Sequence, residues 1–134
     1  MLNGVATVTY FTADLPAAGR WYAEFLGTEP YYAVEGYLEF RIGDHSTELG
    51  LIDSRYVPGG PATPPAGAIP YWQVDDLEAA VDRLLDHGAT LHEPITERGR
   101  GTGFVTASVV DPFGNILGVM RNPHYVEVQA ACRA

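Results

Sequence analysis

Acid–base chemistry in this sequence would centre on Glu48, which lies in a β-rich segment at residues 47–52. Burial in an apolar site can raise the pKa of a glutamate toward the working pH, as a general base requires, and Tyr37 or Tyr71 could then donate a proton to an enolate. A carboxylate on a strand is more commonly a hydrogen-bond acceptor or a solvated side chain. Both interpretations of Glu48 stay open from the sequence.

Residues that could bind a metal are few and scattered. The four histidines form no HxH or HxxxH pair, and capping or surface roles are common for isolated histidines. They are His45, His87, His92 and His124. The single cysteine, Cys132, can form neither an internal disulfide nor a thiolate cluster. Histidine and cysteine spacing therefore gives no indication of a metal site.

The charged residues exclude several classes of function. All eight basic residues are arginines and lysine is absent, which excludes lysine Schiff bases and the attachment of pyridoxal phosphate. A net charge of -9 would repel nucleic acids and anionic membranes. The N-terminus has neither a basic segment nor a long apolar run, so neither a signal peptide nor a spanning helix is expected. We expect a soluble, cytoplasmic protein whose partner is a small molecule, with no nucleic acid and no membrane.

The first half of the chain predicts a strand, a helix and then three strands. Residues 5–11 are β-rich, and the residues after them have apolar side chains at helical spacing. Asp14 can cap this helix, Pro16 fits its first turn, and Gly27 can end it in a left-handed conformation. The three further strands are predicted near residues 30–34, 37–42 and 47–52. This pattern is a βαβββ module.

A second βαβββ module is predicted after a segment rich in proline and glycine, residues 58–67. Residues 69–77 resemble residues 7–15 at an offset of 62. Asp75 or Asp76 can cap a second helix, with Glu78 completing a capping box from Asp75. The strands of this half are predicted near residues 90–93, 104–110 and 116–120, and Gly88 is the expected end of the helix. The chain is thus a tandem duplication within one domain.

The boundaries of this single domain, residues 1–134, follow from the same pattern. We place half one at 4–53, a linker at 54–67, half two at 68–121 and a tail at 122–134. In the tail, Val126 and Val128 alternate in a way that could form an edge segment or a dimer contact, although disorder is expected after about Gln129. Arg98 and Arg100 fall in a glycine-rich loop that either covers a pocket as a lid or extends into solvent.

Three local motifs carry a resemblance to a known family. They are residues 21–27 at the end of the first helix, residues 74–77 before the second helix, and the turn at 111–115, in which Asp111, Pro112 and Gly114 suit a type I turn. Over residues 5 to about 121 the chain resembles the vicinal oxygen chelate superfamily, which includes glyoxalase I, extradiol dioxygenases and bleomycin-resistance proteins. The resemblance implies an α+β fold, with tandem βαβββ modules forming a cup-shaped, barrel-like mixed sheet.

The resemblance also implies where a metal would bind. Metal-dependent members carry one ligand on the first strand of each half, seven residues before the aspartate that opens the helix, and a glutamate on the last strand of each half. This chain has Thr7 and Ile69 at the first two positions and Gly118 after the Asp111 turn, which leaves only Glu48 as a possible ligand. One carboxylate does not hold a divalent ion tightly, so no cofactor is predicted.

Alternation along the strands predicts which side chains face a pocket. In residues 104–110, the small apolar set at 105, 107 and 109 suits packing against a helix, which leaves the intervening side chains for a ligand. Extending this argument to the other strands predicts an aromatic pocket with a few hydrogen-bonding groups. The predicted ligand-binding residues are Thr7, Thr9, Phe11, Tyr37, Glu48, Tyr71, Gln73, Phe104, Thr106, Ser108 and Met120.

Three hypotheses for function follow. The first is a homodimeric binding protein that sequesters an aromatic, drug-like ligand without a conventional metal site, as the resemblance to bleomycin-resistance proteins implies; the negative charge could favour a cationic ligand. The second is a lyase or isomerase of the glyoxalase type that uses Glu48 as the catalytic base, or a non-standard metal site. The third is an interaction module with a filled cavity.

Overall fold

The computed structural model describes Met1, residues 3–57 and residues 68–134. The chain divides into two compact units, Met1–Pro64 and Pro65–Ala134. The predicted linker spans residues 54–67, and its proline- and glycine-rich part, residues 58–67, lies outside the described residues. At its start, Ser54–Tyr56 forms a single 3-10 turn, η1. No helix in the described ranges is long and apolar enough to cross a membrane.

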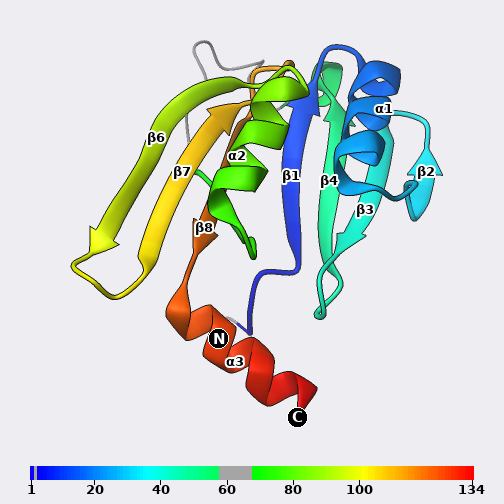
Figure 1. The fold of residues 1–134 in the computed structure, drawn as a ribbon. Helices are drawn as coiled ribbons and strands as arrows, with labels where there is room; N and C mark the ends of the chain where they lie inside the picture. The colour runs from blue at the N-terminus through cyan, green and yellow to red at the C-terminus, as the bar shows by residue number, and fades with distance from the viewer. Residues whose placement is uncertain (2, 58–67) are drawn as a thin grey trace. The chain divides into compact units, whose positions relative to one another are not determined.

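The first unit contains one helix over a four-stranded sheet (Figure 1). The strands are β1 (Thr7–Thr12), β2 (Tyr32–Val34), β3 (Tyr37–Ile42) and β4 (Thr47–Asp53), and the helix is α1 (Leu15–Leu26). Spatially the strands follow the order β1-β4-β3-β2, in which β1 and β4 are parallel and the other neighbours are antiparallel. The predicted βαβββ order of this half is confirmed.

Local sequence signals determine where α1 begins and ends. The Asp14 carboxylate accepts a hydrogen bond from the backbone N–H of Ala17 at 3.1 Å, which satisfies one of the free donors of the first turn. Pro16 occupies that turn, where its missing N–H costs nothing. Gly27 adopts a left-handed conformation with φ of 72° and donates its N–H to the carbonyl of Ala23. All three predicted roles are confirmed.

The second unit repeats the same topology and adds a C-terminal helix. Its elements are β5 (Tyr71–Gln73), α2 (Leu77–Asp86), β6 (Thr90–Gly99), β7 (Phe104–Val110), β8 (Ile116–Arg121) and α3 (Pro123–Arg133). The strand order β5-β8-β7-β6 matches that of the first unit position for position, and β5 and β8 are the parallel pair. The duplication predicted from the sequence is confirmed, and with it the α+β class with mixed sheets. The two sheets are separate in their hydrogen bonding.

Asp76 caps α2, and its carboxylate accepts from the N–H of Ala79 at 3.0 Å. The predicted capping box from Asp75 is wrong. A capping box needs its glutamate three residues after the cap, and with Asp76 in that place the third residue is Ala79, while Glu78 lies one position earlier.

Strand β6 is longer than the sequence predicts, because it continues past Glu93 to Gly99. Pro94 lies inside it, which β6 tolerates because it is an edge strand and its register shifts around this residue. Arg98 therefore belongs to the strand rather than to a loop, and only residues 100–103 form the turn into β7.

The predicted edge segment and the predicted disorder of the tail are wrong. Residues expected to form an edge segment, or to be disordered after Gln129, form the helix α3 instead. Asn122 caps this helix by accepting hydrogen bonds from the N–H groups of His124 and Tyr125, and Pro123 occupies its first turn. These local signals outweigh the valine alternation, which needs a neighbouring strand to matter.

Candidate functional site

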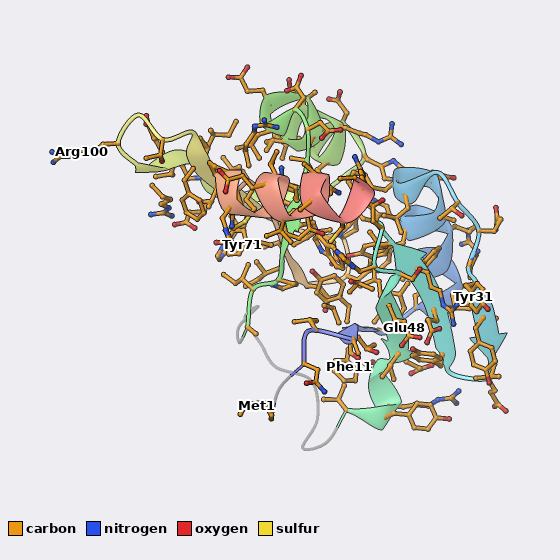
Figure 2. All side chains as sticks on the ribbon, turned by 90° about the horizontal axis from the view of Figure 1, so that it is seen from below. Met1, Phe11, Tyr31, Glu48, Tyr71 and Arg100 are labelled. Atoms are coloured by element: carbon orange, nitrogen blue, oxygen red, sulfur yellow. The ribbon has the colours of Figure 1, made fainter. Side chains whose placement is uncertain are left out.

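The register of the first sheet brings five predicted residues onto one face. Thr7 pairs with Glu48, Thr9 with Gly50, and Phe11 with Ile52, while Tyr37 on β3 is the partner of Ile52 on the other side. Residues paired in register point to the same side of a sheet. Thr7, Thr9, Phe11, Tyr37 and Glu48 therefore share a face, called here the first open face; Figure 2 marks Phe11 and Glu48 on it.

The residues between these positions point the other way and form the core of the first unit with α1. The buried side chains of this core include Tyr10, Phe40, Leu49 and Leu51 from the strands and Tyr22 from α1. The apolar alternation along β1, β3 and β4 thus separates the core from the first open face, as predicted.

Glu48 is held by two neighbours on the first open face. The hydroxyl of Thr7 donates to Oε1 of Glu48 at 2.8 Å, and Nη2 of Arg41 lies 3.9 Å from Oε2. The guanidinium of Arg41 also lies 3.6 Å from the centre of the Tyr31 ring, a cation–π contact. The Glu48 side chain is 31% exposed. Both of its carboxylate oxygens thus have partners within the sheet.

Tyr37 is a strongly held hydrogen-bond donor. Its hydroxyl donates to Oε1 of Glu39 at 2.8 Å. Burial, the hydrogen bond to Glu39 and the negative charges of Glu39 and Glu48 raise the pKa of Tyr37 to about 12, because each disfavours the phenolate. At neutral pH the phenol is protonated and its proton is engaged by Glu39.

The second sheet gathers the remaining predicted residues in the same way. Tyr71 pairs with Gly118, which pairs with Ser108, and Gln73 pairs with Met120, which pairs with Thr106. Phe104 follows the same alternation on β7. These side chains share a face, called here the second open face, and Figure 2 marks Tyr71 on this sheet. Ala107, Val109, Leu117 and Val119 point away from it and are buried.

Both predicted hydroxyls of β7 bind side chains of β6. Oγ of the fully buried Ser108 lies 3.0 Å from Nδ1 of His92, and Oγ1 of Thr106 accepts from Nε of Arg98 at 3.1 Å. Arg98 also donates through Nη2 to Oε1 of Glu93 at 2.7 Å. These contacts of His92 and Arg98 could not be predicted from the sequence, because they depend on how far β6 extends beside β7.

Gln73 has a structural role at the end of β5. Its Oε1 accepts from the N–H of Asn122 at 2.8 Å, and its Nε2 donates to the carbonyl of Val74 at 3.1 Å. Asn122 Nδ2 in turn lies 3.7 Å from the sulfur of Met120. Two predicted ligand-facing residues thus fix the start of α3.

A tyrosine ring covers a glycine on each open face. A β-carbon at Gly50 would lie 2.8 Å from Cε1 of Tyr37, and one at Gly118 would lie 2.5 Å from Cδ1 of Tyr71. The two glycines occupy equivalent places, because Gly50 pairs with Thr9 and Gly118 with Tyr71, which are 62 residues apart. Each glycine leaves room for the ring, which a side chain there would displace.

Two βαβββ modules with identical strand order, each with a sheet face that carries aromatic and hydrogen-bonding side chains, define the glyoxalase-like class of folds. The sequence matches the Glyoxalase/Bleomycin resistance protein/Dioxygenase superfamily over residues 4–119, and the chain belongs to this family. The predicted resemblance is confirmed.

Solved structures agree with this assignment. A glyoxalase-related enzyme from Fulvimarina pelagi is 23% identical, with a TM-score of 0.72 over 91% of this chain and 90% of its own. A protein from Agrobacterium tumefaciens is 15% identical, with a TM-score of 0.74 over 90% of this chain and 98% of its own. A glyoxalase/bleomycin resistance protein from Catenulispora acidiphila is 20% identical, with a TM-score of 0.62 over 87% and 96%. At these identities the likeness concerns the fold. No curated protein matches the sequence.

The residues at the family's metal positions do not fit a metal ion. Thr7, Ile69 and Gly118 stand at the positions where the resemblance implies metal ligands, and the ring of Tyr71 covers Gly118. By strand register Glu48 corresponds to Ile116 rather than to Gly118, so the acidic residue lies two positions earlier on its strand. Among the described residues, no group of three or more histidine, cysteine, aspartate or glutamate side chains could hold a metal.

Proposed function

We propose that this protein binds a small organic, aromatic ligand on its open sheet faces without a conventional metal site. The observation that carries the proposal is that two equivalent glycines, Gly50 and Gly118, each lie under a tyrosine ring, that of Tyr37 from β3 and that of Tyr71 from β5. Aromatic rings beside hydroxyl and carboxylate groups favour a ligand that stacks and accepts or donates a few hydrogen bonds.

The polar groups of the first open face support binding more than proton transfer. Glu48 is engaged by Thr7 and Arg41, and the Tyr37 hydroxyl by Glu39, so neither is directed at a reacting atom. A lyase or isomerase with Glu48 as general base remains the alternative, because catalytic hydrogen bonds can rearrange when a substrate binds.

The first experiment is the metal content of the purified protein, followed by calorimetric titration of zinc, nickel and iron(II) into the stripped form. We expect no bound metal and no saturable binding, because the donor set is missing. About one metal per chain would contradict the proposal and favour glyoxalase-type chemistry.

Ligand binding is then tested with a panel of aromatic compounds by titration calorimetry. We expect saturable binding without turnover, in which the amount of bound ligand is limited by the number of protein sites. Turnover of a panel compound that Glu48→Gln abolishes while binding persists would replace the proposal by the catalytic alternative.

We also propose that the protein is a cytoplasmic homodimer; the homodimer is what the family resemblance implies. Sedimentation equilibrium at several protein concentrations measures the assembly directly, and a monomer at all concentrations would contradict it.

A further inference from the structure

On the second open face, the imidazole of His92 is oriented by the hydroxyl of Ser108. Ser108 is fully buried, whereas its partner His92 is exposed, so the imidazole and not the hydroxyl is accessible to a ligand. The contact engages Nδ1 and leaves Nε2 without a hydrogen-bond partner among the described residues. A histidine with one ring nitrogen held in this way presents the other in a fixed direction.

Arg98 is held on the same face in a similar manner. Its Nε donates to Thr106 and its Nη2 to Glu93, while a guanidinium has five N–H donors in all. The partner residues Thr106 and Ser108 are two residues apart on β7 and point to the same side, so the strand places the two contacts about 7 Å apart along β7. Two basic groups are thus anchored to neighbouring hydroxyls on one face of β7.

The charges around His92 make this face responsive to pH. The groups that share its face are Glu93 and Arg98 on β6, Thr106 and Ser108 on β7, and Tyr71 on β5, while β8 contributes the uncharged Gly118 and Met120. Glu93 is neutralised by its 2.7 Å contact with Arg98. Protonation of the imidazole therefore gives this face a net positive charge, in contrast to the first open face, where Glu39 and Glu48 outnumber Arg41.

We propose that His92, oriented by Ser108, and Arg98, oriented by Thr106, together bind the carboxylate of an aromatic acid. In this arrangement the protonated imidazole donates from Nε2 to one oxygen, and the guanidinium donates to the carboxylate as charge-assisted hydrogen bonds require. The aromatic part of the ligand lies toward Tyr71, across Gly118. This inference rests on the proposed function and names the chemical class of its ligand.

The test compares benzoate with benzamide, which have the same shape but differ in charge. The imidazolium form of a histidine is favoured at low pH, so a carboxylate held by His92 should make benzoate bind about tenfold more weakly at about pH 8 than at about pH 5.5. Benzamide should bind equally at both values. In NMR spectra, benzoate at the lower pH should move the ring signals of His92, and benzamide should leave them in place.

Four variants separate the contributions. We expect His92→Gln to remove the pH dependence of benzoate binding, while His45→Gln, a control in a turn of the first unit, retains it. Arg98→Gln should weaken benzoate about fivefold at both pH values, because arginine stays charged throughout. Ser108→Ala should weaken benzoate about threefold at the lower pH only, because it frees the imidazole to rotate without changing the charge of the face.

The outcomes distinguish this inference from the proposed function. Equal binding of benzoate and benzamide at both pH values, or a pH dependence that survives in His92→Gln, would overturn the inference and leave the aromatic binding function standing. If neither probe perturbs any residue of the open faces at either pH, both proposals are overturned.

Discussion

Gly118 lies beneath the ring of Tyr71, its partner in the parallel register of β5 and β8. A β-carbon at this position would meet Cδ1 of Tyr71 at 2.5 Å and the backbone carbonyl oxygen of Pro70 at 2.9 Å. The ring could turn aside, but the Pro70 carbonyl is part of the backbone and accepts the hydrogen bond of the Gly118 N–H at 2.9 Å in the parallel pairing. The glycine is therefore required by the packing of the second open face.

Gly118→Ala should destabilise the protein by about 1–3 kcal/mol, the usual cost of overpacking. Urea unfolding followed by circular dichroism measures the change. In a Tyr71→Ala background the same substitution should cost less, because only the Pro70 contact remains. An equal cost in both backgrounds would show that the ring does not occupy the space above Gly118.

Titration of Tyr37 provides a second prediction. Its pKa is raised to about 12 by burial and by Glu39 and Glu48, and so it lies above the value of 10.0 expected in the unfolded chain. The stability linked to this phenol is present below about pH 10 and is lost as the pH rises through about 12. The last step of the tyrosinate absorbance titration should belong to Tyr37.

The control for this assignment is the pair Tyr37→Phe and Glu39→Gln. The first should delete the last titration step, and the second should move it to lower pH, because the carboxylate charge and its acceptor strength are lost. A last step unchanged by both substitutions would assign it to another of the eight tyrosines.

Local signals in the sequence sufficed for most of the fold. Asp14, Pro16 and Gly27 each have a chemistry that fits one place in a helix, so the bounds of α1 could be predicted without any knowledge of tertiary contacts. The open faces could be predicted for the same reason, since strand alternation requires only that one side be apolar.

The partners of Thr106 and Ser108 could not be predicted, because they depend on pairing between distant segments. Pro94 signals the end of a strand in sequence, whereas β6 continues past it at the edge of the sheet. Only this continuation brings the side chain of Arg98 within hydrogen-bonding distance of Thr106, whose register partner is Thr96. Strand alternation thus predicts that the two hydroxyls share one face of the sheet, but not which side chains contact them.

The C-terminal helix gives a third prediction, since a local cap there was overlooked. Asn122→Ala should remove two hydrogen bonds to the first turn of α3 and cost about 1 kcal/mol, whereas Asn122→Ser should retain most of the cap. Hydrogen exchange of residues 123–133 measures this locally. Because no side chain of α3 is buried, exchange should increase in this helix while the sheet remains protected.

Glu48→Gln distinguishes the two functional hypotheses. The pair with Arg41 is partly exposed and 3.9 Å long, so its loss should cost less than about 1 kcal/mol, and the amide can still accept from Thr7. The folded variant should therefore bind an aromatic ligand with affinity within a few-fold of the parent.

Thr7→Val is the matched control, because it removes the hydrogen bond to Glu48 but leaves the carboxylate in place. If Glu48 only contributes to ligand binding, the two substitutions should have similar and small effects on ligand affinity, which titration calorimetry measures. A carboxylate that removes a proton from a substrate would behave differently, since turnover would vanish in Glu48→Gln and persist in Thr7→Val. Such a result would assign catalysis to the first open face and contradict a purely binding role.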